Sequence, residues 1–488
     1  MTDAANLILF LSDNHTRNFV GAYGHPIVQT PILDKIAGRG VRFDNAYCAS
    51  PLCCPSRAAL ATGRYPHQTG YWDNALAYDG KTPTWHHRVR DSGATVTSIG
   101  KLHFQSGDND NGFTDEIIPM HIVEGKGALI GLLRATEEGV PPRSGPREMY
   151  SRSGVGEADY QNYDRDITKC AVDWLNNEGA RLDKPWVLLV SYASPHPPFA
   201  IPKRLYDLYP PEHIPLPVQF DADNRPDHPA VNHVRRVDNF EEPLDEDWVR
   251  RTVAGYCGLI THVDEQIGQV MGAVEDLGLL PTTRVMYTSD HGEAAGNHGL
   301  FGKSVLYDHS MAVPLIMAGP GVPEGRSVTQ IASHVDLYPT IVEAMDARFS
   351  TREDTDLSGI SLWPAMQGKA SPRLGFGEFH SQSSKTGSYM LRDGYNKLIY
   401  HVDMPTQYFD LQLDPFETQD LSGEGSPKVA ELEAKLRAIV DPEEADYRAK
   451  TDQLTHIERF GGADAVRQRG TFNYSPVPGD DAKMETFR

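Results

Sequence analysis

Short apolar runs recur along the chain, and several of them end in charged or imidazole side chains. The runs are "NLILFLSDN", "ATVTSIG", "WVLLVSY", "TRVMYTSDHGE" and "VPLIMAGPG", which begin at residues 6, 94, 186, 283 and 313. Continuous runs of this length predict strands that are buried on both faces, as in a parallel sheet.

Helical spacing of apolar residues occupies the segments between these runs. Thr30 as N-cap, Pro31 at the first helical position and Gly40 beyond the end predict a helix between them. Similar spacing is present at 165–177, at 334–345 and at about 245–280, where one long helix and a broken pair both fit. The alternation predicts an α/β fold, with a doubly wound, mostly parallel sheet flanked by helices and ligands at its carboxyl edge.

The pattern changes after about residue 370. Residues 389–402 and 407–421 alternate around turn residues, which predicts a small antiparallel sheet. A polar helix at about 426–440 and a tail with "RGTFNYSPVPGDD" follow. We therefore expect a catalytic α/β domain over 1–370 and a C-terminal subdomain with an oligomerisation tail over 371–488.

The composition limits the partners. A chain of 488 residues with 39% hydrophobic and 23% charged residues is an ordered globular protein. Its net charge of −21 argues against nucleic acid and anionic membranes, so an anionic substrate needs a local basic pocket. The apolar run at 7–11 is too short for a signal peptide or a membrane span, and five cysteines predict no disulfide framework. We expect a cytoplasmic protein.

Metal-ligand residue types follow two of the buried runs. Asp13 and Asn14 end the first, and Asp290 and His291 end the fourth. Either pair alone is more typical of a helix cap or turn. Together with the loop that carries Cys53, however, they offer carboxylate, amide and imidazole groups that suit Ca²⁺ or Mn²⁺.

The stretch "CCPSRAALATGR", residues 53–64, resembles the signature of the type I sulfatases, in the alkaline phosphatase superfamily. Cys53 takes the place of the family's cysteine, and Cys54 fills a variable position. "SDN", "TSDHGEAAGNHGLFGKS" and "YFDLQLDPFETQDL" are similar to the family's two metal segments and its C-terminal hairpin. "YWDN", "GKLHF" and "SPHPPF" resemble the branch of choline sulfatases, phosphonate monoester hydrolases and related cytoplasmic arylsulfatases.

The resemblance implies hydrolysis of sulfate monoesters by a modified cysteine. A maturation enzyme would oxidise Cys53 to formylglycine, and the hydrated aldehyde would provide a gem-diol nucleophile for an in-line attack on a small anionic ester. The implied ligands of one divalent ion are Asp13, Asn14, Cys53, Asp290 and His291. Many sulfatases have other residues at 14 and 291, and this difference shifts the expected ion from Ca²⁺ toward Mn²⁺.

Basic residues supply the other implied roles. Arg57 would brace the nucleophile, and Lys101 would contact the diol or the sulfate; His103, two residues along an extended segment, would act as the base. The substrate contacts are assigned to Asn74, Lys101, His196 and Lys303, and His196 and Lys303 would assist the leaving oxygen. Each role has a purely structural alternative: an ordinary ion pair for Arg57, a packed histidine for His103 and a surface lysine for Lys303.

Four other functions remain open. The same nucleophile serves a phosphonate monoester or phosphodiester hydrolase, and a choline sulfatase would add an aromatic cage, for which Tyr71, Trp72 and Trp85 are candidates. A binding protein without catalysis and a redox pair of Cys53 and Cys54 fit the residues less well. The tail resembles an arm that reaches a neighbouring subunit in relatives, which implies a homodimer or homotetramer.

Overall fold

The computed structural model describes residues 5–423 and 426–485. Its centre is an eight-stranded sheet in the order β11-β2-β10-β9-β1-β7-β4-β5. These strands are β1 (Asn6–Ser12), β2 (Gly40–Phe43), β4 (Thr95–Lys101), β5 (Asp115–Met120), β7 (Trp186–Ser191), β9 (Thr283–Ser289), β10 (Leu315–Ala318) and β11 (Arg326–Val328). Strand β1 pairs in parallel with β7 and β9, whereas β10 runs antiparallel to β9 and β2. The predicted doubly wound, mostly parallel sheet is confirmed.

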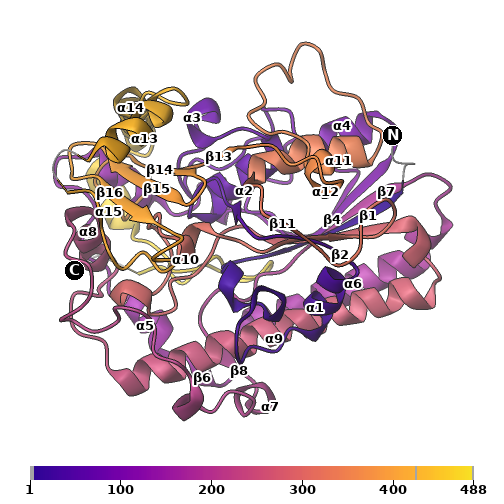
Figure 1. The fold of residues 1–488 in the computed structure, drawn as a ribbon, viewed down its shortest axis with the longest axis horizontal. Coiled ribbons are helices and arrows are strands. Elements are labelled where there is room, and N and C mark those ends of the chain that lie inside the picture. The colour runs from indigo at the N-terminus through magenta and orange to yellow at the C-terminus, as the bar shows by residue number, and fades with distance from the viewer. Residues whose placement is uncertain (1–4, 424–425, 486–488) are drawn as a thin grey trace.

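Helices cover both faces of this sheet (Figure 1). One face carries α1 (Pro31–Gly38), α6 (Asp159–Asn177) and α9 (Glu246–Asp276), so the segment near 245–280 is a single unbroken helix. The other face carries α2 (Cys53–Thr62), α4 (Trp85–Asp91), α11 (Leu337–Ala344) and α12 (Trp363–Met366). Shorter helices lie in the connections: α3 (Pro66–Thr69), α5 (Gly145–Ser151), α7 (Lys203–Tyr206), α8 (Pro229–Val237) and α10 (Asp308–Met311).

Alternate side chains of β1 enter two separate cores. Leu7, Leu9 and Leu11 pack with α2, α4 and α11, whereas Ile8 and Phe10 pack with α1, α6 and α9. All five are buried, because successive side chains of a strand point to opposite faces. This two-sided burial explains the uninterrupted apolar run in the sequence.

The C-terminal part forms a four-stranded antiparallel sheet, as predicted. It consists of β13 (Leu374–Phe379), β14 (Ser388–Asp393), β15 (Asn396–His401) and β16 (Gln407–Asp410). Helices α13 (Pro427–Arg437), α14 (Pro442–Arg459) and α15 (Ala463–Arg469) follow. Two-stranded pairs complete the fold: β3 (Ala46–Tyr47) with β12 (Ala332–Ser333), and β6 (Gly154–Val155) with β8 (Ala200–Ile201).

The two sheets share a core. Leu7 and Leu9 of β1 pack in one cluster with Met390 of β14 and Ile399 of β15. The expected boundary at residue 370 lies between the large sheet and the second sheet. That this boundary divides the chain into two domains stays a prediction. Within the described ranges, no helix is both long and apolar enough to cross a membrane.

Candidate active site

The strand register places two acidic residues side by side. Ser12 pairs with Ser289 at the carboxyl ends of β1 and β9, so Asp13 and Asp290 leave the sheet together. Both are completely buried. The backbone turns at Asn14, where φ is +73°, and its N–H donates to Asp290 Oδ1 at 3.2 Å. The sheet edge thus concentrates carboxylates where parallel α/β folds bind ligands.

Helix α2 brings the third component. It begins at Cys53 and is buried over its whole length, which its small residues allow. The N–H of Cys54 donates to Asn74 Oδ1 at 3.1 Å and so satisfies one amide of the first turn. Gly63 ends the helix with φ +68°, and a Cβ there would lie 2.8 Å from that of Tyr338. Position 53 is therefore held at a fixed helix start.

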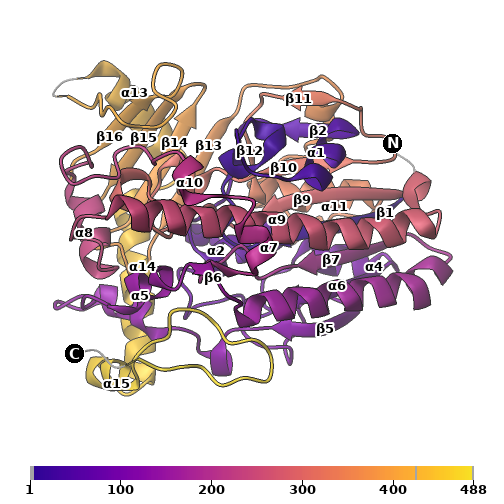
Figure 2. The ribbon, with the colours of Figure 1, turned by 90° about the horizontal axis from the view of Figure 1, so that it is seen from below.

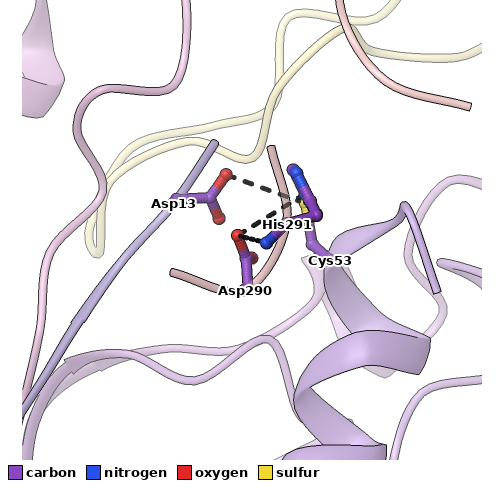
Figure 3. A group of neighbouring side chains, drawn as sticks. All are labelled: Asp13, Cys53, Asp290 and His291. Carbon is purple, nitrogen blue, oxygen red and sulfur yellow. Dashed lines mark hydrogen bonds and ion pairs between the residues drawn. The ribbon is translucent and has the colours of Figure 1, made fainter. Parts of the chain in front are cut away.

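Four side chains converge at this point (Figure 3). Asp13, Cys53, Asp290 and His291 each offer a ligand atom, and these atoms lie within 4.8 Å of one another. Cys53 Sγ is 3.2 Å from His291 Nε2 and 3.9 Å from Asp13 Oδ1. Two carboxylates and an imidazole in a buried cluster fit a divalent cation.

The side chain of Asn14, the fifth predicted ligand, forms hydrogen bonds with Lys303 and Glu293. Its Oδ1 accepts from Lys303 Nζ at 2.9 Å, and its Nδ2 donates to Glu293. Glu293 is completely buried and also accepts from Tyr150 and from two backbone N–H groups. Burial raises the pKa of Glu293 to about 7. Sequence reasoning missed this residue, although it lies three positions after Asp290 in "SDHGE".

Two basic side chains balance the negative charges of Asp13 and Asp290. Arg57 donates from Nε to Asp290 Oδ2 at 2.8 Å and from Nη2 to Asp13 Oδ2 at 3.1 Å. Lys101 Nζ lies 2.8 Å from Asp13 Oδ2. The guanidinium thus holds the carboxylates, whereas we expected it to contact the nucleophile, and that role stays a prediction.

The net effect of burial and neighbouring charges lowers the pKa of Asp13 but raises the pKa of Cys53. Burial opposes ionisation of Asp13, but Lys101, His196 and Lys303 outweigh it and hold its pKa well below the usual value. Burial and the Asp13 charge raise the pKa of the Cys53 thiol to about 11. At neutral pH the site therefore contains a carboxylate and a protonated thiol.

The predicted substrate contacts line one cavity of roughly 100 Å³. These contacts are Asn74, Lys101, His196 and Lys303, and the predicted catalytic residues Cys53 and His103 line the same cavity. Lys303 Nζ lies 3.3 Å from Cys53 Sγ, which places a positive charge next to the expected nucleophile. Strand β4 ends at Lys101, and His103 has φ +55°, so the extended segment that we expected stops before His103. Both residues nevertheless reach the same cavity.

The remaining wall comes from loops and the tail. Arg143 pairs with Asp238, and Ser383 donates to the same carboxylate. Arg143, Asp238, Gln382 and residues 472–475 line the cavity. No motif marks these positions, and no sequence pattern predicts that they meet.

The three candidate cage aromatics do not line this cavity among the described residues. Trp72 donates to Asp452 at 2.8 Å, and Tyr71 donates to Asp79 at 2.8 Å. Trp85 packs on His86 at a ring separation of 4.0 Å. A cage for a quaternary ammonium group is not formed by these residues.

Comparison with known proteins agrees with this geometry. A model of the family described as "Sulfatase" matches residues 5–347, and one described as "N-sulphoglucosamine sulphohydrolase, C-terminal" matches residues 296–445. The chain belongs to the sulfatase family. This sulfatase is 30% identical over 462 residues to arylsulfatase K of Gallus gallus, covering 89% of this chain and 82% of the relative. It is 28% identical over 465 residues to choline-sulfatase of Rhizobium meliloti (strain 1021), covering 91% and 87%.

Solved structures share the fold of this sulfatase. The phosphonate monoester hydrolase of Agrobacterium radiobacter superposes with a TM-score of 0.71 at 22% identity, covering 92% of this chain and 96% of the other. A protein in complex with its substrate D-glucosamine-2-N,6-O-disulfate gives a TM-score of 0.71 at 21% identity, with coverages of 91% and 100%.

Proposed function

We propose that this sulfatase hydrolyses sulfate monoesters of the arylsulfatase type, with Cys53, after conversion to formylglycine, as the nucleophilic position. The observation that carries this proposal is the cluster of Asp13, Cys53, Asp290 and His291 beside a cavity lined by Lys101 and Lys303. A tetrahedral anion requires positive charge on the cavity side and a nucleophile beneath it. The membership of the family and the names of the relatives support the reaction class.

The unmodified thiol does not supply the nucleophile itself, because burial and Asp13 raise its pKa to about 11. A divalent ion and a formylglycine, when present, supply the positive charge and the acidic hydroxyl that cysteine lacks. Lys101 and Lys303 bind the ester oxygens, and Lys303 stabilises the departing alkoxide. On a formylglycine at position 53, His103 would take the proton of the remaining hydroxyl, so that the aldehyde would re-form as its bond to the sulfate oxygen breaks.

A phosphonate monoester or phosphodiester hydrolase is the second candidate. It is supported by the fold shared with the phosphonate monoester hydrolase and by the similar single negative charge of the two substrate classes. Paired kinetics on an aryl sulfate and a phenyl phosphonate ester separate the candidates. A preference of several decades for the phosphonate would replace the first proposal with the second.

Adjacent cysteines provide a matched test of the nucleophile. We expect peptide mass spectrometry of protein co-expressed with a maturation enzyme to show the loss of ~18 Da at Cys53 and none at Cys54. Cys53→Ala should abolish turnover of the aryl sulfate. Cys54→Ala, in the variable position beside it, should retain most of the turnover. Full activity of Cys53→Ala would exclude the proposed nucleophile.

Metal dependence tests the ligand cluster. Treatment with a chelator should abolish turnover, and elemental analysis of the purified protein should find one divalent ion per chain. We expect Mn²⁺ to restore at least as much activity as Ca²⁺, since imidazole suits the softer ion better. Asp290→Asn should lose the ion. Full activity in the metal-free protein would contradict the assignment.

The partners and location follow from the same reasoning. We propose a formylglycine-generating enzyme as the maturation partner, and a homodimer or homotetramer in solution. All five cysteines are free, which supports a reducing compartment such as the cytoplasm. Light scattering of the purified full chain tests the oligomeric state.

A further inference from the structure

The C-terminal segment folds onto the active-site cavity of its own chain. Thr471 N donates to Glu485 O at 2.8 Å and Glu485 N donates back at 2.6 Å, which closes residues 471–485 into a loop. Figure 2 shows this loop in yellow, after α15. Residues 472–475 line the cavity that contains Cys53. The tail is therefore part of the site in this single chain.

Two hydrogen bonds fix Ser475 in this position. Its carbonyl oxygen accepts from the Tyr160 hydroxyl of α6 at 2.7 Å, which anchors the backbone. Its Oγ lies 2.9 Å from His103 Nε2. Ser475 and His103 are only 7% and 6% exposed, so solvent offers little competition for this bond.

The other ring nitrogen of His103 is unused. His103 Nδ1 is buried and has no hydrogen-bond partner among the described residues. A buried polar atom without a partner costs free energy. A role of that atom in the reaction is one reason for a site to retain it. His103 lines the cavity together with Cys53 and Lys303. Nδ1 is therefore the ring nitrogen that no described residue occupies.

We propose that Ser475 is a positioning residue for His103: its Oγ accepts the Nε2 hydrogen and leaves the lone pair on Nδ1. A neutral imidazole carries one hydrogen, so a base that reacts through Nδ1 must hold that hydrogen on Nε2. Burial, together with Lys101 and Arg57, lowers the pKa of His103 well below its usual value and keeps the ring neutral. The inference rests on the proposed function, in which His103 removes a proton.

The tautomer can be measured without turnover. The full chain is labelled with ¹⁵N-histidine, and the His103 signals are assigned by their loss in His103→Gln. We expect a single Nε2–H tautomer in the wild type and a mixture of tautomers in Ser475→Ala. An Nδ1–H tautomer in the wild type, or no change in Ser475→Ala, would overturn the inference. The wild-type spectrum alone decides the tautomer if the alanine variant does not fold.

Steady-state kinetics on an aryl sulfate test the consequence for catalysis. Ser475→Ala should lower kcat by roughly 10-fold with little change in KM, since loss of an orienting partner typically costs 10–100-fold. Ser475→Thr, which keeps the hydroxyl, should restore most of kcat. Thr471→Val is the matched control, because Thr471 Oγ1 makes only a 3.5 Å contact with Phe472 O.

Two kinetic results would contradict a positioning role. One is an effect of Ser475→Ala on KM alone, and the other is an equal loss in Ser475→Thr and Ser475→Ala. Wild-type protein that carries formylglycine and metal but hydrolyses no sulfate ester would refute the proposed function. The tautomer measurement would still decide the contact between Ser475 and His103.

Discussion

The thiol encoded at position 53 is protonated at neutral pH and is therefore a weak nucleophile. The thiol is buried, and the negative charge of Asp13 further disfavours its ionisation. A redox pair with Cys54 is equally unsupported, since both thiols are free and burial raises the pKa of Cys54 well above its usual value. A formylglycine fits these surroundings better than the thiol, because a bound cation makes its hydroxyl acidic and therefore reactive.

Lys303 carries the largest expected effect among the cations of the cavity. Its Nζ is the donor that contacts both Asn14 Oδ1 and Cys53 Sγ. Lys303→Ala should lower kcat by roughly 10²–10³-fold, because a preorganised charge next to the transferred group is lost. Lys184→Ala, at an exposed position before β7, is the control and should have wild-type rates. Unchanged kcat in Lys303→Ala would exclude the leaving-group role.

At the scale of elements, helix α1 shows what local sequence can and cannot predict. Its start at Pro31 was predicted, but the Thr30 side chain makes no cap bond. Asp264, on helix α9 and far away in the sequence, accepts from the N–H groups of Ile32 and Leu33 instead. Gly40 is required for a different reason than we expected: a Cβ there would lie 2.1 Å from Met317 O in the neighbouring strand.

The same limit applies to the active site. Residues that directly follow buried strands, such as Asp13 and Asp290, could be predicted because parallel strands end at one edge. Arg143, Asp238 and Ser475 could not, because their meeting depends on how loops and the tail pack over that edge. Local patterns contain no signal for such long-range contacts.

The loop that carries His196 depends on one buried acid of α6. Asp164 accepts from the N–H groups of Ala193 and Ser194 at 2.8 and 3.2 Å. Burial nevertheless raises the pKa of Asp164 to about 6. The folded state therefore favours the protonated acid, and this stabilisation is present at low pH and lost as the pH rises through about 6.

The pH dependence of stability tests this assignment. Between pH 5 and pH 8, the free energy of unfolding of the wild type should fall by roughly 1.4 kcal/mol relative to Asp164→Asn. Burial lowers the pKa of the neighbouring His262 to about 4, so that ring stays neutral over this range. Denaturant titrations of both proteins at the two pH values measure the difference. A constant difference between the two proteins would contradict the raised pKa.

At the scale of the molecule, the acidic surface and the basic cavity act together. The chain has a net charge of −21, yet the buried Arg57 and Lys101 and the partly buried Lys303 lie around Asp13 and Cys53. A local positive potential attracts small anions, while the overall charge disfavours nucleic acid and other large polyanions. Gln382, in the connection between β13 and β14, and residues 472–475 of the tail line the cavity beside these cations.

A buried ion cluster joins the second sheet to helix α10. Lys397 of β15 is completely buried and lies 2.7 Å from Asp308 Oδ1 and 2.6 Å from Glu417 Oε1. Asp308 begins α10, a short distance after the loop of Lys303. The cluster thus ties the C-terminal subdomain to the segment that follows the active site.

Removal of the shared cation should destabilise the whole chain. Lys397→Ala removes the cation that Glu417 and Asp308 share and leaves Asp308 with the ion pair to Arg17 at 3.3 Å. Breaking a buried pair typically costs about 3–5 kcal/mol. Because the two sheets share a core, we expect one cooperative transition at a lower denaturant concentration in the variant. Lys435→Ala, which removes an exposed ion pair of α13, is the control and should leave the midpoint almost unchanged. Separate unfolding of the second sheet, with the α/β core intact, would show instead that this cluster does not couple the two parts.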